Sequence, residues 1–374
     1  MNATEFRETI PALEDGVYLN TGASGPSPRH VVEAAHRCLE YHEYDAPTAE
    51  GMYESADTVY ETARASVARL LGISPEEVAL TQSTTDGINA VAGAIDWQEG
   101  DVVVRTDLEH AAGILAWQGL ERRRGIEVSV LETEEGYVDL EDVKDVVAEA
   151  RLLVVSSITW THGTRLPIAE MVDIAHDAGT AVLVDAVQSP GQTPVDVEAW
   201  GADFVAAAGH KWLLGPFGSG FLVVRDGVED DFGLELAPSN IGYRSVEDPD
   251  AGDYRYKPGA HRFEVGTTSP VAHAGLVAAI DLLETVEVDR IETRIEGLTD
   301  RLKDGIREDD LLSPRAFESG LVTISVDDVD ATVERLAEHG IVVRSMPGLG
   351  TDAIRASVHT FNTPTDVDAL LEAL

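Results

Sequence analysis

The stretches AVLVDAVQ at residues 181–188 and DFVAAAGHKWLLGPFGSGFLVV at residues 203–224 decide the fold. Each contains an apolar run of strand length that ends in polar residues: Asp185 in the first stretch and Lys211 in the second. Runs that are apolar on both sides of a strand indicate a sheet that is covered by helices on both faces.

A regular pattern surrounds these stretches: from about residue 60 to 225, short apolar runs alternate with helical patterns. Alternation of this kind is typical of an open, mostly parallel sheet. After residue 270, long helical patterns lead into LVTISVDD, IVVRSM and AIRASVHT, which indicates a smaller α+β domain with an antiparallel sheet. We therefore predict an α/β protein with a large domain of residues 16–268 and a small domain of residues 1–15 and 269–374.

The charge composition excludes some classes of partner. The chain has 68 acidic and 27 basic residues, a formal net charge of -41, so nucleic acid and anionic membrane surfaces are not expected to bind it. Only four of the basic residues are lysines: Lys144, Lys211, Lys257 and Lys303. This bias is typical of adaptation to very high salt, which screens carboxylate repulsion. We interpret the chain as haloarchaeal; an acidic mesophilic protein is the alternative.

Cys38 is the single cysteine, which excludes an intramolecular disulfide and a cysteine-rich metal site. No bound metal is predicted. The sequence opens with no secretory signal pattern, and no apolar run approaches 18 residues. We therefore expect a cytoplasmic protein that does not cross a membrane.

Ligands of open α/β sheets bind beyond the carboxyl ends of the strands, so the residues that follow the apolar runs are the candidates. Ser83, Thr84 and Thr85 form a hydroxyl-rich turn before a helical pattern, which suits a phosphate. A plain helix-capping turn is the alternative. Asp185 needs a cationic partner if it is buried, although a structural arginine would suffice. An apolar setting lowers the pKa of a lysine such as Lys211 and favours imine chemistry, whereas an isolated lysine is more often solvated.

Taken together, these residues resemble the class V aminotransferases, a family of enzymes that use pyridoxal 5'-phosphate (PLP) and that includes cysteine desulfurases, kynureninases and isopenicillin N epimerases. The resemblance covers nearly the whole chain. Its motifs are YLNTGASGP at 18–26, ALTQSTTDGIN at 79–89, EH at 109–110, VDAVQS at 184–189, AAGHKWLLGPFGSGFL at 207–222, RFEVGTTS at 262–269 and IRASVHTFNTPTDVDALL at 354–371. The segments at 241–246 and 257–267 look more similar to the epimerase and selenocysteine-lyase branch. The resemblance implies a fold-type I architecture with a seven-stranded sheet.

The resemblance also implies roles for single residues. Lys211 would carry PLP as a Schiff base and later transfer a proton. Asp185 would pair with the pyridine nitrogen and keep it protonated. Gln188 would hydrogen-bond the phenolic oxygen, and His110 would stack over the ring.

The remaining assignments concern the phosphate and the substrate. Thr84, Thr85 and His210 would hold the phosphate, and Thr267 would reach the phosphate in the neighbouring subunit, so a homodimer with shared sites is implied. Arg355 or Arg344 matches the arginine that binds the substrate carboxylate. A surface or interdomain ion pair is the alternative for both arginines.

One departure bears on the reaction. Cysteine desulfurases carry a nucleophilic cysteine between the two arginine segments, but SMPGLGTDAI at 345–354 contains none. We therefore predict a PLP enzyme that acts at the α-carbon of a small amino acid, either an aminotransferase or a lyase of the cysteine and cystine type. A desulfurase is the alternative, and a non-catalytic PLP-fold binding partner is the alternative of another class.

Overall fold

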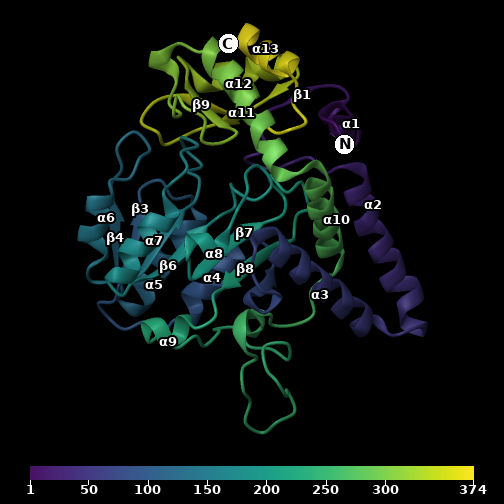
Figure 1. Ribbon diagram of the computed structural model, residues 1–374, viewed down its shortest axis with the longest axis vertical. Coiled ribbons are helices and arrows are strands. Elements are labelled where there is room, and N and C mark those ends of the chain that lie inside the picture. Colours follow the sequence, from purple (N-terminus) through teal and green to yellow (C-terminus); the bar gives the residue numbers. More distant parts are fainter.

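A seven-stranded sheet forms the centre of the protein in the computed structural model, which describes all 374 residues (Figure 1). The strand order is β2-β8-β7-β6-β5-β3-β4. The strands are β2 (Val78–Thr81), β3 (Val102–Thr106), β4 (Glu127–Leu131), β5 (Ala150–Ser156), β6 (Ala181–Asp185), β7 (Phe204–Ala208) and β8 (Gly220–Val224). Only β8 runs against its neighbours, so the prediction of a mostly parallel, seven-stranded sheet is confirmed.

Side chains of the central strands alternate between two apolar layers, as the period of two in a strand requires. Leu183 and Phe204 face one layer, which α4 and α5 cover, while Val184 and Val205 face the other, which α3, α6, α7 and α10 cover. Helices therefore exclude water from both faces of the sheet. This explains why the sequence of these strands is apolar at nearly every position.

Helices connect the strands and flank the sheet. The helices of this part are α2 (Arg29–Glu40), α3 (Met52–Leu71), α4 (Thr84–Ala94), α5 (Ala112–Arg124), α6 (Leu140–Val147), α7 (Ile168–Asp177), α8 (Val197–Trp200), α9 (Val228–Phe232) and α10 (Val271–Val286). Capping residues explain where two of these helices begin or end. Ser83 caps α4 by accepting a hydrogen bond from the Asp86 amide, and α5 ends at Gly125, which has a φ of 73°.

A second, smaller α+β unit stands at the carboxyl-terminal side of the chain and lies at the top of Figure 1. Its sheet is antiparallel, as predicted, and the strand order is β11-β12-β9. Its elements are α11 (Val288–Gly305), β9 (Leu321–Ser325), α12 (Val329–Glu338), β10 (Ile341–Val342), β11 (Arg344–Ser345), β12 (Ala353–Ser357) and α13 (Pro364–Ala373).

The N-terminal segment belongs partly to this smaller unit. After α1 (Ala3–Glu8), β1 (Val17–Tyr18) pairs in parallel with β10, while α10 packs against α2 and α3 beside the large sheet. The division of the chain at residues 16 and 268 stays a prediction.

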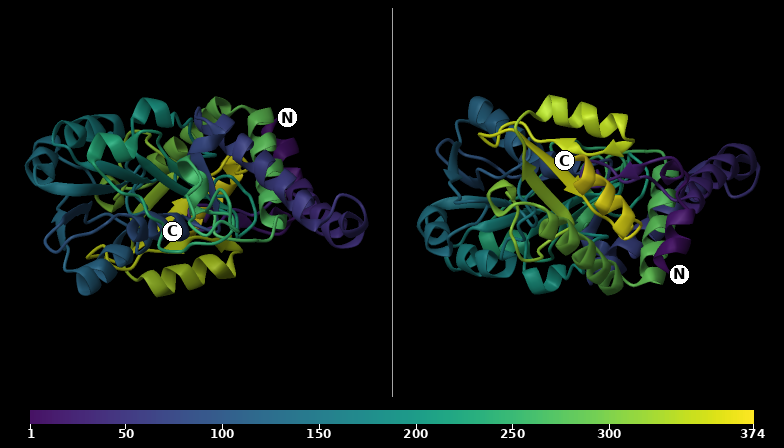
Figure 2. Two further views of the ribbon diagram at one scale, coloured as in Figure 1. Left: turned by 90° about the horizontal axis from the view of Figure 1, so that it is seen from below. Right: turned by 90° about the horizontal axis from the view of Figure 1, so that it is seen from above.

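Two segments project from the body of the protein. The arm formed by α2, the π-helical turn Tyr41–Asp45 and the start of α3 extends sideways in both views of Figure 2. The chain that follows α9 extends as a loop from the bottom of the body in Figure 1, and a bridge between Val246 and Tyr256 closes this loop. No helix of the chain has the length and apolar character needed to span a membrane.

Candidate active site

Six of the seven strands run in one direction, so their carboxyl ends meet along a single edge of the sheet. A cavity of about 210 Å³ lies at this edge and is closed by residues of the smaller unit. Its walls are Gly22, Ala23, His110, Ser156, Ile158, Trp160, Asp185, Val187, Gln188, His210, Lys211, Arg344 and Arg355. Most of the residues that the sequence singles out therefore come together in one place.

Lys211 stands on a tight turn after β7. The Leu214 amide donates to the Lys211 carbonyl at 3.0 Å, and the Gly25 amide donates to the His210 carbonyl at 2.7 Å. A Cβ atom at Gly25 would lie 2.2 Å from the Lys211 carbonyl oxygen, so only glycine lets the N-terminal segment pack against this turn. The backbone on both sides of Lys211 is therefore held in place.

The amine of Lys211 is prepared for nucleophilic chemistry. Burial lowers its pKa to about 8, and the charge of Asp185 opposes this shift only in part. The Nζ atom forms no ion pair and faces the cavity. A larger fraction of this amine is therefore unprotonated at neutral pH than of an exposed lysine.

Asp185 ends β6, the strand next to β7, and only 3% of the residue is exposed. One carboxylate oxygen, Oδ1, accepts a hydrogen bond from the Val187 amide at 3.0 Å. Burial raises the pKa of Asp185, while this hydrogen bond and Lys211 lower it. A cationic nitrogen placed in the cavity would compensate the buried charge.

A second buried carboxyl lies behind Asp185. Glu109 is 3% exposed and accepts hydrogen bonds from the Ser156 amide at 3.0 Å, the Ser156 hydroxyl at 2.7 Å and the Thr106 hydroxyl at 2.8 Å. Ser156 pairs with Asp185 across β5 and β6. Burial raises the pKa of Glu109 to about 7, against these donors. The sequence presented Glu109 at a strand end, but it gave no sign of these partners.

His110 and Trp160 form one wall of the cavity. Their rings meet edge to face, with 5.4 Å between the centroids. The Nδ1 atom of His110 accepts the Ala112 amide, and burial together with Lys211, Arg344 and Arg355 lowers the pKa of His110. The ring is neutral near pH 7 and exposed toward the cavity, as stacking on a flat ligand would require.

Gln188 lies in the cavity wall, but protein groups already use much of its amide. The Oε1 atom accepts the indole N–H of Trp212 at 2.7 Å, and Nε2 donates to the Gly22 carbonyl at 3.1 Å. One N–H remains for a ligand oxygen. The predicted bond to the phenolic oxygen of PLP therefore stays a prediction that this geometry permits.

The predicted phosphate ligands lie at the next part of the same edge. The Thr84 hydroxyl, in the first turn of α4, and the Nδ1 atom of His210 are buried without any hydrogen-bond partner. Gly220 leaves this corner open, because a Cβ there would lie 2.9 Å from the Ser83 nitrogen. Unpaired buried donors beside a helix N-terminus fit a phosphate group. The Thr85 side chain is exposed, and neither threonine lines the 210 Å³ cavity itself.

Thr267 is separate from this cavity within one chain. Its exposed hydroxyl lies 2.8 Å from the hydroxyl of Tyr243, on the segment that precedes α10. The prediction that Thr267 serves the neighbouring subunit is compatible with this exposure and stays untested.

Two arginines reach the cavity from the smaller unit. Arg355 in β12 is 2% exposed, and its Nη1 atom donates to the Trp160 carbonyl at 2.5 Å, while its Nε atom has no partner. Burial and Arg344 lower the pKa of Arg355 to about 9. Arg344 stands directly opposite Arg355 in the antiparallel pair of β11 and β12. Neither guanidinium has a carboxylate partner in the protein, which argues against the interdomain ion pair and for an anionic ligand.

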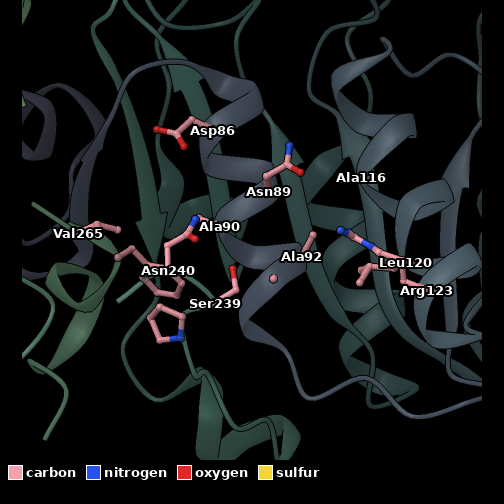
Figure 3. Close-up of a pocket in the computed structure, with 13 residues that line it drawn as sticks. Asp86, Asn89, Ala90, Ala92, Ala116, Leu120, Arg123, Ser239, Asn240 and Val265 are labelled. Carbon is pink, nitrogen blue, oxygen red and sulfur yellow. The ribbon is translucent and has the colours of Figure 1, made fainter. Parts of the chain in front are cut away.

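A different cavity, of about 220 Å³, lies on the large domain between α4, α5 and the segment around Ser239 (Figure 3). Asp86 and Asn89 of α4 and Arg123 of α5 contribute its polar groups. No lysine lines this cavity, so it offers no amine that could form an imine. No cluster of histidine, cysteine or acidic side chains has an arrangement that would hold a metal ion.

Comparisons with known proteins identify the family and the fold of the chain. The model of the family described as aminotransferase class-V matches residues 17–370. The chain is 34% identical to the "Probable cysteine desulfurase" of Methanothermobacter thermautotrophicus, over 100% of this chain and 98% of that protein. The apo cysteine desulfurase of Thermococcus onnurineus NA1 superimposes with a TM-score of 0.90 at 30% identity, covering 98% of this chain and 96% of that one.

A lyase has the same fold. The complex of the cystine C-S lyase C-DES with its reaction product cysteine persulfide superimposes with a TM-score of 0.89 at 26% identity, covering 97% of this chain and 98% of that one. A variant of C-DES with glycine covalently linked to the PLP cofactor gives a TM-score of 0.90 at 27% identity, over 98% of each chain.

Proposed function

Because the chain belongs to the aminotransferase class-V family of PLP-dependent enzymes, we propose that it breaks the carbon–sulfur bond of a cysteine-type or cystine-type amino acid by elimination. The observation that carries this proposal is the joint opening of Lys211, Asp185 and Arg355 into one cavity. These three side chains offer an amine, a carboxylate and a guanidinium to one small ligand.

The cofactor, when bound, accepts the electron pair that remains at the substrate α-carbon after a proton leaves. Lys211 would hold the cofactor through Nζ, and the Asp185 carboxylate would keep the ring nitrogen cationic. Thr84, Thr85 and His210 would bind the phosphate, Gln188 the phenolic oxygen, and His110 would cover the ring face. The unpaired polar atoms at Thr84 and His210 support this assignment.

The remaining steps use the same side chains. Arg355 would hold the α-carboxylate of the substrate, because its guanidinium is buried and fixed at one end by the Trp160 carbonyl. Lys211 Nζ would then take the α-proton, for which its lowered pKa is suited. Loss of the sulfur substituent from the β-carbon would complete the elimination. With cystine and water, the products would be pyruvate, ammonia and cysteine persulfide.

Two features favour elimination over a persulfide relay on the enzyme. The segment between β11 and β12 carries no cysteine, and Cys38 lies on α2 and does not line the cavity. The C-DES lyase shows that the same fold serves a C–S lyase.

Desulfuration is the second candidate, because relatives at about one-third identity are named cysteine desulfurases. The deciding experiment measures keto acid, ammonia, alanine and sulfide or persulfide together, for cysteine and for cystine at high salt. Elimination yields pyruvate and ammonia in equal amounts, desulfuration yields alanine, and transamination yields keto acid without ammonia. Alanine as the main product, surviving Cys38→Ser, would replace the lyase by a desulfurase.

A homodimer is part of the proposal. Thr267 is exposed and lies two residues after Val265, which lines the cavity shown in Figure 3 together with Asn240. A second copy seated there would bring its own Thr267 toward the phosphate site. Light scattering would give twice the chain mass, and a monomer that binds PLP with full activity would contradict the shared site.

A further inference from the structure

The cavity at Lys211 contains more positive charge than one carboxylate requires. Lys211, Arg344 and Arg355 face a single carboxylate, that of Asp185, in a chain whose formal net charge is -41. His110 and His210 add no charge, since burial and Lys211 lower the pKa of both. With the cofactor joined to Lys211 and its ring nitrogen beside Asp185, as proposed, only Arg344 and Arg355 remain for the substrate, so a substrate that gives each arginine its own carboxylate is anionic at two points.

The two arginines lie at different depths. Arg355 is 2% exposed and its guanidinium is tied to the Trp160 carbonyl, whereas Arg344 is exposed to solvent at the cavity mouth. They are direct partners in an antiparallel pair, where Cβ atoms are only about 5 Å apart and like charges destabilise the pairing. A ligand that supplies negative charge to both arginines would reduce this repulsion.

The position of Lys211 decides which arginine takes which group. The α-carbon of a substrate must approach the buried Nζ atom, so the α-carboxylate lies deep and meets Arg355. The far end of the substrate then points toward the mouth, where Arg344 stands without an ion-pair partner.

From this geometry we infer that Arg344 binds a second, distal carboxylate, so that the enzyme selects amino acids with a carboxylate at each end, such as cystine, over cysteine. This inference rests on the proposed function for the reaction, but it concerns recognition alone. Because Arg344 is exposed, its contribution to selectivity is about fivefold at most and decreases as salt rises.

Ligands without sulfur separate recognition from reaction. 2,7-Diaminosuberate has the length and both carboxylates of cystine but no carbon–sulfur bond, and norleucine has one carboxylate. Both would be titrated into the PLP-loaded wild type and into Arg344→Gln, Arg355→Gln and Arg122→Gln, with the visible absorption of the cofactor as signal. Arg122 is an exposed arginine of α5 outside the cavity and controls for loss of one positive charge.

The wild type is expected to bind diaminosuberate about fivefold more tightly than norleucine, a difference of about 1 kcal/mol. Arg344→Gln removes most of this ratio, Arg355→Gln weakens both ligands, and Arg122→Gln changes neither. An unchanged ratio in Arg344→Gln, or no preference in the wild type, would overturn the inference. Failure of the proposed reaction would appear separately, as absence of pyruvate and sulfur release from cysteine and cystine.

Discussion

The cavity at the sheet edge and the outer surface of the protein carry opposite charge for different physical reasons. The cavity places three cationic side chains around one carboxylate, while the surface carries most of the 68 acidic residues. Charge deep in the cavity, as at Asp185 and Arg355, is desolvated, so its pairing with a ligand is strong and local. Charge on the surface is hydrated and repels itself over longer distances, so the solvent must screen it.

The cavity and the surface should therefore respond to different experimental changes. A substitution in the cavity should change cofactor binding and catalysis, with little effect on how the stability of the fold depends on salt. A change of salt should alter the stability of the whole fold while leaving the cavity chemistry intact in the protein that remains folded.

Replacement of Lys211 should produce the largest effect. Lys211→Ala removes the only amine in the cavity, so we expect loss of the absorption of lysine-bound PLP and a fall in activity of at least about 10³-fold. Lys144→Ala, which changes an exposed lysine of α6, is the matched control. Borohydride reduction followed by peptide mass spectrometry would locate the attached cofactor, and attachment at another lysine in the variant would refute this role.

Salt should have the next largest effect, and it acts through the surface. With a net charge of -41 and a Debye length of about 10 Å at 0.1 M salt against about 3 Å at 1 M, repulsion is screened only in concentrated salt. We expect the free energy of unfolding to fall by several kcal/mol between 3 M and 0.1 M KCl, as measured by thermal or urea unfolding.

Sucrose at matched water activity is the control, because it promotes compaction without screening charge. Equal stability in 0.1 M and 3 M KCl would contradict the adaptation to high salt that the four lysines and the acidic surface indicate.

Much of this framework could be predicted from the sequence, because the signals are local. Apolar runs that end at Asp185 and before Lys211 predict buried neighbouring strands, and parallel strands bring their carboxyl ends together. The smaller α+β unit follows from its own strand and helix patterns in the same way.

Contacts between distant segments could not be predicted. The two-residue strand at Val17 pairs with Ile341 across the length of the chain, and no periodicity is visible in so short an element. The opposition of Arg344 and Arg355 depends on the register of β11 against β12. The bonds that Gln188 forms with Trp212 and Gly22 arise only after three separate segments have packed.

Substitution of Glu109 should have the smallest of these effects. Glu109 relates the two regions to each other, because it is acidic like the surface residues but is buried like the cavity residues. Burial raises its pKa to about 7 from an unfolded value near 4.5. The folded state therefore binds a proton that the unfolded state has lost, so stability decreases as pH rises from about 4.5 to 7. Glu109→Gln keeps the shape without the charge. At pH 8 it should stabilise the cofactor-free protein by up to about 3 kcal/mol, at about 1.4 kcal/mol for each pKa unit.

The gain should vanish below pH 4.5, where both side chains are neutral. The Ser156 hydroxyl can rotate to accept from the new amide, while the amide oxygen accepts from both the Thr106 hydroxyl and the Ser156 amide, so no buried group loses its partner. Urea unfolding at pH 4.5 and pH 8 in concentrated KCl measures the difference, with the exposed Glu121→Gln as control. A Glu109→Gln effect that is the same at both pH values would show that folding does not raise the pKa of Glu109. The three hydrogen bonds that Glu109 accepts would then offset the effect of burial on its pKa.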